Sequence, residues 1–167
     1  MVFINRKVNL SLLILAFFFV AGCASNNTIP PSPTKLEFKL GSFDEFSGSV
    51  SYRTNDEFDK VVYVNDKAVL TASHIESVDY TASQFLPGAY DVVMELDDVG
   101  TKILAEITTN HLGQVMALII NEQVVLAATI YNPIMYGQFI ISGIESLDKE
   151  KAKKLKKKIR RAMKSAD

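Results

Sequence analysis

Residue patterns that carry enzyme chemistry are missing from this sequence. The two histidines, His74 and His111, lack the H-E-x-x-H spacing of a zinc site, and the chain has neither a G-x-S-x-G nucleophile elbow nor a Walker loop for phosphates. Asp97 and Asp98 are adjacent acids, but they stand where a helix needs a cap. We therefore expect a protein that is not an enzyme and that uses no metal or cofactor.

Cysteine is also scarce, because Cys23 is the only one in 167 residues. A single cysteine excludes a disulfide within the chain, so an exported protein would need another use for this thiol. The sequence also lacks an apolar run of the roughly 20 residues that a membrane-spanning helix needs. Its apolar run at 8–20 is shorter and is interrupted by Asn9 and Ser11.

Residues 1–22 have the order of a bacterial export signal, with two basic residues, an apolar run and small residues at the end. The tetrapeptide VAGC at 20–23 is similar to a lipobox, which implies cleavage before Cys23 and acylation of its thiol. The alternative is a secretory signal that ends beside an unmodified thiol. Several acyl chains anchor a protein stably. In lipoproteins, Ala24 after the cysteine implies sorting to the outer membrane, facing the periplasm.

Composition divides the rest of the chain into three parts. Residues 23–34 are polar with three prolines, so they predict a tether that can extend roughly 30 Å at about 3.1 Å per residue. A single domain is expected over 35–146, followed by a basic segment at 147–167. Residues 23–146 contain six Lys or Arg and sixteen Asp or Glu, whereas 147–167 contain ten and three. The body is therefore acidic and the tail basic.

Strand-forming residues recur along the predicted domain. Strands are expected at 35–40, 60–64, 89–96 and 138–143. The apolar segments 115–120 and 124–130 flank a short polar turn and predict a β-hairpin in the middle of the sheet.

A pattern typical of a capped helix covers 97–113. Asp97 or Asp98 can cap its N-terminus, and Gly113 suits the left-handed conformation that often ends a helix. Three apolar residues repeat at i, i+4 and i+8 and predict the buried face: Val99, Ile103 and Ile107.

The basic tail predicts a second helix, which Ser146 can cap and which carries its acids in the first turn. Its narrow apolar stripe consists of Ala152, Leu155, Ile159 and Ala162 or Met163. Its candidate contact residues for a membrane or an acidic partner are Lys153, Lys154, Lys157, Arg160 and Arg161.

Three interpretations of this tail are open: a solvated helix whose stripe packs on its own sheet, a surface helix attracted to anionic lipid headgroups, or a clamp for the acidic body or an acidic partner. The narrow, aromatic-free stripe favours the first. Nucleic acid is not expected as a partner of an exported protein.

The order strand, helix, hairpin, strand and helix predicts an α+β domain with a largely antiparallel sheet and helices on one face. Residues 92–143 resemble the head of the first periplasmic domain of SecD, a membrane protein that assists protein export. The residues that correspond are Leu96, Asp97, Gly100, Thr108, His111, Gly113, Met116 to Ile120, Ala127 to Ile130, and Ile141 to Gly143. Segments 35–40 and 69–78 are also similar to family segments, so the resemblance runs from about Lys35 to Met163.

The resemblance implies a ferredoxin-like head fold and a surface that faces polypeptides. Three departures from the family pattern are the Asn-Glu hairpin turn, Ala128 in place of a common proline, and Tyr136-Gly137 in place of a glycine pair. SecD also has several transmembrane helices and uses the proton gradient with its partner SecF. This sequence shows no such helices, so no proton-driven motor is expected.

Aromatic residues near the expected loops can form a groove for extended apolar peptides, or they can be ordinary core and rim residues. Tyr131, Tyr136 and Phe139 are the candidate contacts for a polypeptide or protein partner. We predict a non-catalytic envelope lipoprotein that binds exported polypeptides or a partner of the export or assembly machinery. The alternative is a structural or adaptor protein without client binding, whose basic helix docks on a membrane or an acidic partner.

Overall fold

The computed structural model describes residues 33–54, 60–144 and 147–166. The chain divides into two compact units, Met1–Pro31 and Ser32–Asp167, and every described residue belongs to the second. The predicted export signal, Cys23 and nearly all of the tether lie outside the described residues. No helix in the described part is long and apolar enough to cross a membrane.

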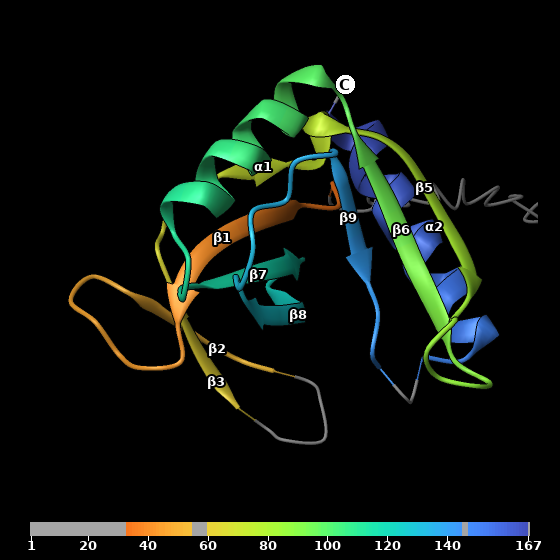
Figure 1. Cartoon of the computed structure of the whole chain (residues 1–167), viewed down its shortest axis with the longest axis horizontal. Coiled ribbons are helices and arrows are strands. Elements are labelled where there is room, and N and C mark those ends of the chain that lie inside the picture. Colours follow the sequence, from red (N-terminus) through yellow and green to blue (C-terminus); the bar gives the residue numbers. More distant parts are fainter. Residues whose placement is uncertain (1–32, 55–59, 145–146, 167) are drawn as a thin grey trace, which may run out of the picture. The chain divides into compact units, whose positions relative to one another are not determined.

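The described residues of the second unit form two antiparallel sheets and two α-helices (Figure 1). The first sheet has the order β2 (Val50–Arg53), β3 (Val61–Val64), β1 (Leu36–Ser42), β7 (Val115–Ile120) and β8 (Gln123–Thr129), and β4 (Leu70–Thr71) also pairs with β1. The second has the order β5 (Ile75–Ala82), β6 (Tyr90–Leu96) and β9 (Gln138–Ile141). A 3₁₀ turn, η1 (Ala72–His74), precedes β5; α1 (Asp98–Asn110) links β6 to β7, and α2 (Lys149–Ala166) follows β9.

The first sheet separates two apolar clusters. Residues of β7 alternate between them, because successive strand side chains point to opposite faces: Leu118 joins the larger cluster, and Ile119 joins a smaller one with Val62. A parallel bridge between Thr54 and Val124 brings the two ends of the sheet together. The sheet therefore curls around the smaller cluster, and all six residues of β7 are buried.

The predicted α+β class is confirmed, but the single sheet is wrong. The strand expected at 89–96 pairs with β5 on one side and with the strand expected at 138–143 on the other, separately from the strands around the hairpin. A sequence pattern marks a strand but does not choose its partner. A specifically ferredoxin-like arrangement is not what this strand order gives.

The hairpin prediction is partly confirmed. Asn121 and Glu122 form a two-residue turn with φ of 49° and 62°, the left-handed pair of a type I′ turn, and Gln123 already belongs to β8. Asn121 also exchanges two hydrogen bonds with Lys35 at the start of β1. Of the two hairpin strands, β7 lies inside the sheet and β8 is at the end of the strand order.

The first helix begins as predicted, but the side that it turns to the core only partly matches the predicted face. Asp97 caps it, since its carboxylate accepts a hydrogen bond from the Gly100 N–H at 2.6 Å. The buried residues are Gly100, Leu104 and Thr108, while Val99 is exposed. The predicted face is therefore partly confirmed: Ile103 and Ile107 are half-buried and pack against the larger cluster, whereas Val99 is exposed. A side chain at position 100 would collide with His74, so the close approach at this glycine sets the rotation of the helix.

The second helix packs through its predicted stripe. Ala152, Ile159 and Ala162 are buried, and the helix lies against β5, β6 and η1 (Figure 1). The Asp148 side chain accepts a hydrogen bond from the Lys151 N–H, and the Asp148 carbonyl accepts one from the Ala152 N–H. The proposed cap, Ser146, lies outside the described residues.

Candidate functional surface

The connection between β8 and β9, residues 130–137, runs beside α1 (Figure 1) and is hydrogen-bonded to that helix and to residues on either side of it. The Gly113 N–H donates to the Ile130 carbonyl at 2.9 Å, and the Ile134 N–H donates to the Thr108 hydroxyl at 2.8 Å. Thr108 and Gly113 are among the residues that correspond to the SecD head in the family resemblance. In this structure, both residues hold the β8–β9 loop.

The far end of this loop reaches the first turn of α1. The Leu96 N–H donates to the Gly137 carbonyl at 2.8 Å. Gly137 has φ of 68°, a conformation that side-chain-bearing residues rarely adopt, and a side chain there would collide with Thr101. Glycine thus allows the loop to pass directly against the helix.

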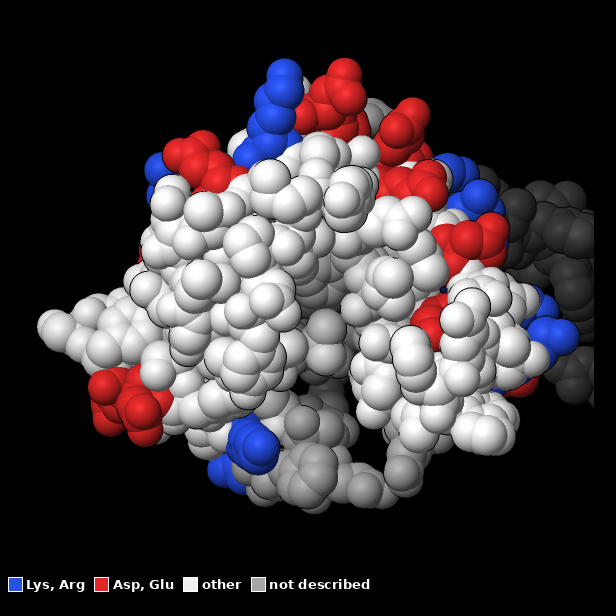
Figure 2. Space-filling view, in the orientation of Figure 1, with Lys and Arg blue, Asp and Glu red and all other residues white. Residues whose placement is uncertain are grey.

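The fixed loop displays large apolar side chains. Tyr131 and Tyr136 are 80% and 93% exposed, Met135 is exposed, and Ile140 of β9 is 47% exposed. Figure 2 shows that the middle of this view, in the orientation of Figure 1, is largely free of charged residues, which lie along its margin. We call these four residues the loop–β9 surface.

Strand β9 also has a free backbone edge. Within the described residues its only strand neighbour is β6. Since Leu96 and Gly137 form a hydrogen-bonded pair and such pairs alternate along an antiparallel ladder, the N–H and C=O of Gln138 and Ile140 point away from β6. This edge lies beside the exposed side chains of the loop–β9 surface.

Phe139 is the candidate contact that the structure removes from the surface. Its side chain is 7% exposed, and its ring packs edge-on against Phe38 with centroids 4.9 Å apart. Strand alternation turns Phe139 inward and Ile140 outward. Ile140 and Met135 were missed, although the alternation in QFII was the signal that would have identified Ile140.

The remaining candidate residues are divided between structural positions and the surface of α2. His74 Nδ1 accepts the Thr71 N–H at 3.2 Å, and His111 Nδ1 lies 2.9 Å from the Ile107 carbonyl, so each histidine serves a local turn. The five cations predicted to contact a membrane or acidic partner are all exposed: Lys153, Lys154, Lys157, Arg160 and Arg161. They lie on α2, whereas Tyr131 and Tyr136 lie on the β8–β9 loop.

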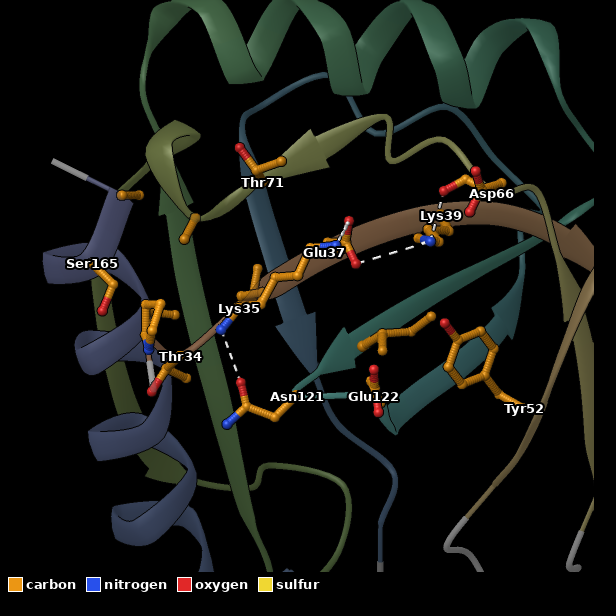
Figure 3. Close-up of a pocket in the computed structure, with 16 residues that line it drawn as sticks. Thr34, Lys35, Glu37, Lys39, Tyr52, Asp66, Thr71, Asn121, Glu122 and Ser165 are labelled. Carbon is orange, nitrogen blue, oxygen red and sulfur yellow. Dashed lines mark hydrogen bonds and ion pairs between the residues drawn. The ribbon is translucent and has the colours of Figure 1, made fainter. Parts of the chain in front are cut away.

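A groove of about 810 Å³ lies between the start of β1, the hairpin turn and the end of α2 (Figure 3). The ammonium group of the buried Lys39 donates a hydrogen bond to the Asp66 backbone carbonyl at 2.7 Å. Lys35 and Glu37 form an ion pair at 2.9 Å. Burial, reinforced by Glu37, raises the pKa of Tyr52. Lys39 also lies 3.9 Å from Glu37, so this carboxylate has a lysine on either side in a polar groove between elements.

Comparisons with known proteins identify relatives of this domain. The family model of the SecDF P1 head subdomain matches residues 49–163, which ends where the sequence resemblance ends. The protein translocase subunit SecD of Rickettsia bellii (strain RML369-C) is 33% identical over 81 residues. The aligned region is 48% of this chain and 15% of that protein, so the chain spans only a small part of its curated relative.

Solved structures share the fold. One is SecDF, described as a membrane component that enhances protein export, with a TM-score of 0.55 and 19% sequence identity. The match covers 80% of the present chain and 63% of the SecDF chain. SecDF in the super-membrane-facing form has a TM-score of 0.57 and 19% sequence identity. This match covers 80% of the present chain and 19% of the SecDF chain. SecDF of Thermus thermophilus, a translocon-associated membrane protein, has a TM-score of 0.55 and 21% sequence identity. This match covers 79% of the present chain and 20% of the SecDF chain.

Proposed function

The chain belongs to the SecDF P1 head subdomain family, and from this premise we propose that it is a non-catalytic, lipid-anchored envelope protein that binds extended segments of exported polypeptides. The observation that carries this proposal is the loop–β9 surface. Its side chains are large, apolar and exposed, although burial of such side chains is normally favourable. A surface of this kind on a folded domain is suited to contact with another polypeptide.

The free edge of β9 supports an extended conformation for the bound segment. A peptide that adds to a sheet edge pairs through its backbone, and alternate side chains then contact the side chains beside the edge. The outward N–H and C=O groups of Gln138 and Ile140 would provide the pairing. Tyr136 and Ile140 would provide apolar contacts without selecting a particular sequence.

The anchor in this proposal is Cys23, acylated and placing the domain at the outer membrane, facing the periplasm. The VAGC tetrapeptide supports it. Metabolic labelling with a fatty acid tests the anchor separately from client binding. We expect label on the parent chain and none on Cys23→Ser; label retained on the variant would refute acylation of this thiol.

Photo-crosslinking in intact cells tests client binding. We would place a photoreactive residue at Tyr131 or Tyr136, with Phe85, an aromatic residue that is 83% exposed on the β5–β6 connection, as the control position. We expect many heterogeneous adducts at Tyr131 and Tyr136 and few at Phe85. One sharp band would instead indicate a dedicated partner and an adaptor role, and equal labelling at all three positions would contradict a defined surface.

A matched pair of substitutions at Ile140 tests the backbone edge. Ile140→Pro removes an N–H that points away from β6 and therefore leaves the pairing with β6 intact, whereas Ile140→Val keeps the N–H and an apolar side chain. We expect the proline variant to lose most adducts at Tyr136 and the valine variant to keep them. Equal adduct yields in both variants, with unchanged circular dichroism, would rule out edge pairing.

A further inference from the structure

The outward side of α2 is a continuous row of positive charge. We call it the cationic face, and it consists of Lys153, Lys154, Lys157, Arg160, Arg161 and Lys164, all of which are exposed. Spacings of three and four residues place these like charges next to one another, an arrangement that destabilises a helix in isolation. Among the described residues none of the six forms an ion pair, although Arg160 adds to the effect by which Lys156 lowers the pKa of Asp79. The charge of this face is therefore available to an external anion.

The orientation of the cationic face is fixed by contacts on both sides of the buried stripe. On one side, Lys156 forms a 2.7 Å ion pair with Asp79 and lies 5.4 Å from the centre of the Tyr80 ring. On the other, Lys158 donates to the side chain of Gln123 at 3.1 Å. With its apolar residues already buried in the domain, α2 cannot insert them into a bilayer. It can only present its cations.

The chain enters the domain beside the end of the same helix. Pro33 and Thr34 line the groove together with Ala162 and Ser165 of the last turns of α2. Figure 3 shows Thr34 next to this end of the helix. Cys23 precedes Pro33 by roughly ten residues, which is about 30 Å of extended chain. An anchor at Cys23 would therefore keep the cationic face within reach of the bilayer surface.

We propose that the cationic face docks on the anionic headgroups of the bilayer to which the chain is anchored. The match is one of charge: six unpaired cations on a rigid face meet a surface of phosphate groups. This inference depends on the anchor at Cys23 but not on client binding. Near an anionic surface each cation strengthens association about fivefold, and the effect is screened by salt.

The test uses the full lipidated chain reconstituted into vesicles. Because Cys23 is the only cysteine and is acylated in this form, one added cysteine can be labelled selectively with a fluorophore. Ser165→Cys places the label on α2, and Thr109→Cys is a matched control on α1, since each hydroxyl is exposed and donates to the carbonyl four residues earlier. Nitroxide-headgroup lipids then quench a label that lies at the membrane surface.

We expect strong quenching at position 165 in phosphatidylcholine vesicles that contain phosphatidylglycerol, little quenching in pure phosphatidylcholine, and little at position 109 in either. High salt should abolish the difference. Lys157→Gln with Arg161→Gln, added to Ser165→Cys, should lower the ratio of docked to undocked protein about 25-fold. Lys67→Gln with Lys102→Gln removes two exposed lysines outside α2 and should leave the ratio unchanged.

Two failures are distinguishable. A chain that does not float with pure phosphatidylcholine vesicles lacks the anchor, which would refute that part of the proposed function. A chain that floats but shows the same quenching at position 165 in neutral and anionic vesicles overturns the docking proposal and leaves the cationic face to an acidic protein. Unchanged quenching in the Lys157→Gln/Arg161→Gln variant, with its helix content intact, would also overturn it.

Discussion

At the scale of single residues, Gly137 determines how closely the β8–β9 loop approaches α1. Two effects act at this position: φ is 68°, and a side chain would overlap Thr101. Gly113 separates the two effects, because its φ is 83° but nothing lies within 4 Å of the place where a side chain would begin. The two glycines therefore form a natural comparison.

We expect Gly137→Ala to lower the free energy of unfolding by about 2–4 kcal/mol, and Gly113→Ala by about 1–2 kcal/mol, because only the first adds a collision to the backbone strain. Urea denaturation followed by circular dichroism measures both values. Thr101→Ala combined with Gly137→Ala should recover part of the loss, since it removes two of the overlapping atoms. Equal losses at the two glycines would show that the contact with Thr101 is unimportant.

At the scale of elements, one buried hydroxyl joins the β8–β9 loop to α1. Thr108 is fully buried, donates to the Leu104 carbonyl at 2.7 Å and accepts the Ile134 N–H at 2.8 Å. The hydroxyl thus satisfies a carbonyl inside the helix and an N–H of the loop at once. Tyr131 and Tyr136, on either side of Ile134, are positioned by this contact.

We expect Thr108→Val to destabilise the domain by about 1–3 kcal/mol, because it leaves the Ile134 N–H without its partner at nearly constant side-chain volume. Hydrogen exchange should show faster exchange of the Ile134 amide in this variant. Thr108→Ser keeps the hydroxyl and should preserve the protection of that amide. If Thr108→Val leaves the exchange rate unchanged, another contact holds the loop.

At the scale of the whole second unit, the two apolar clusters are joined through shared strands. On β7, Leu118 belongs to the larger cluster and its neighbour Ile119 to the smaller one. Side chains on the two faces of one strand cannot lose their packing independently, because both depend on the same backbone position. We therefore expect the two clusters to unfold together.

Ile119→Ala tests this coupling. The cavity should cost about 2–5 kcal/mol, and Ile119→Val, which removes a single methyl group, about 0.5–1.5 kcal/mol. Tyrosine fluorescence and far-ultraviolet circular dichroism should report one coincident transition in both variants. Separate midpoints for the two probes would mean that the curled sheet and the second sheet unfold as independent parts.

Much of the local structure could be predicted from short patterns. The strands at 35–40, 60–64 and 89–96, the Asp97 cap, the left-handed Gly113 and the apolar stripe of α2 all occur where the sequence places them. Each of these features depends on a few neighbouring residues, through periodicity, capping or backbone conformation. The family was also identifiable from residue motifs, and the family match confirms it.

Tertiary structure alone decided which residues meet. It separated the strands into two sheets, buried Phe139 and exposed Ile140, and rotated α1 so that Gly100 approaches His74. It also placed Thr34 beside the end of α2, although more than a hundred residues lie between them in the chain. Such contacts depend on packing between distant segments, which no local pattern encodes. The amino-acid sequence by itself determined the elements and their charges, and packing determined the surfaces that they form.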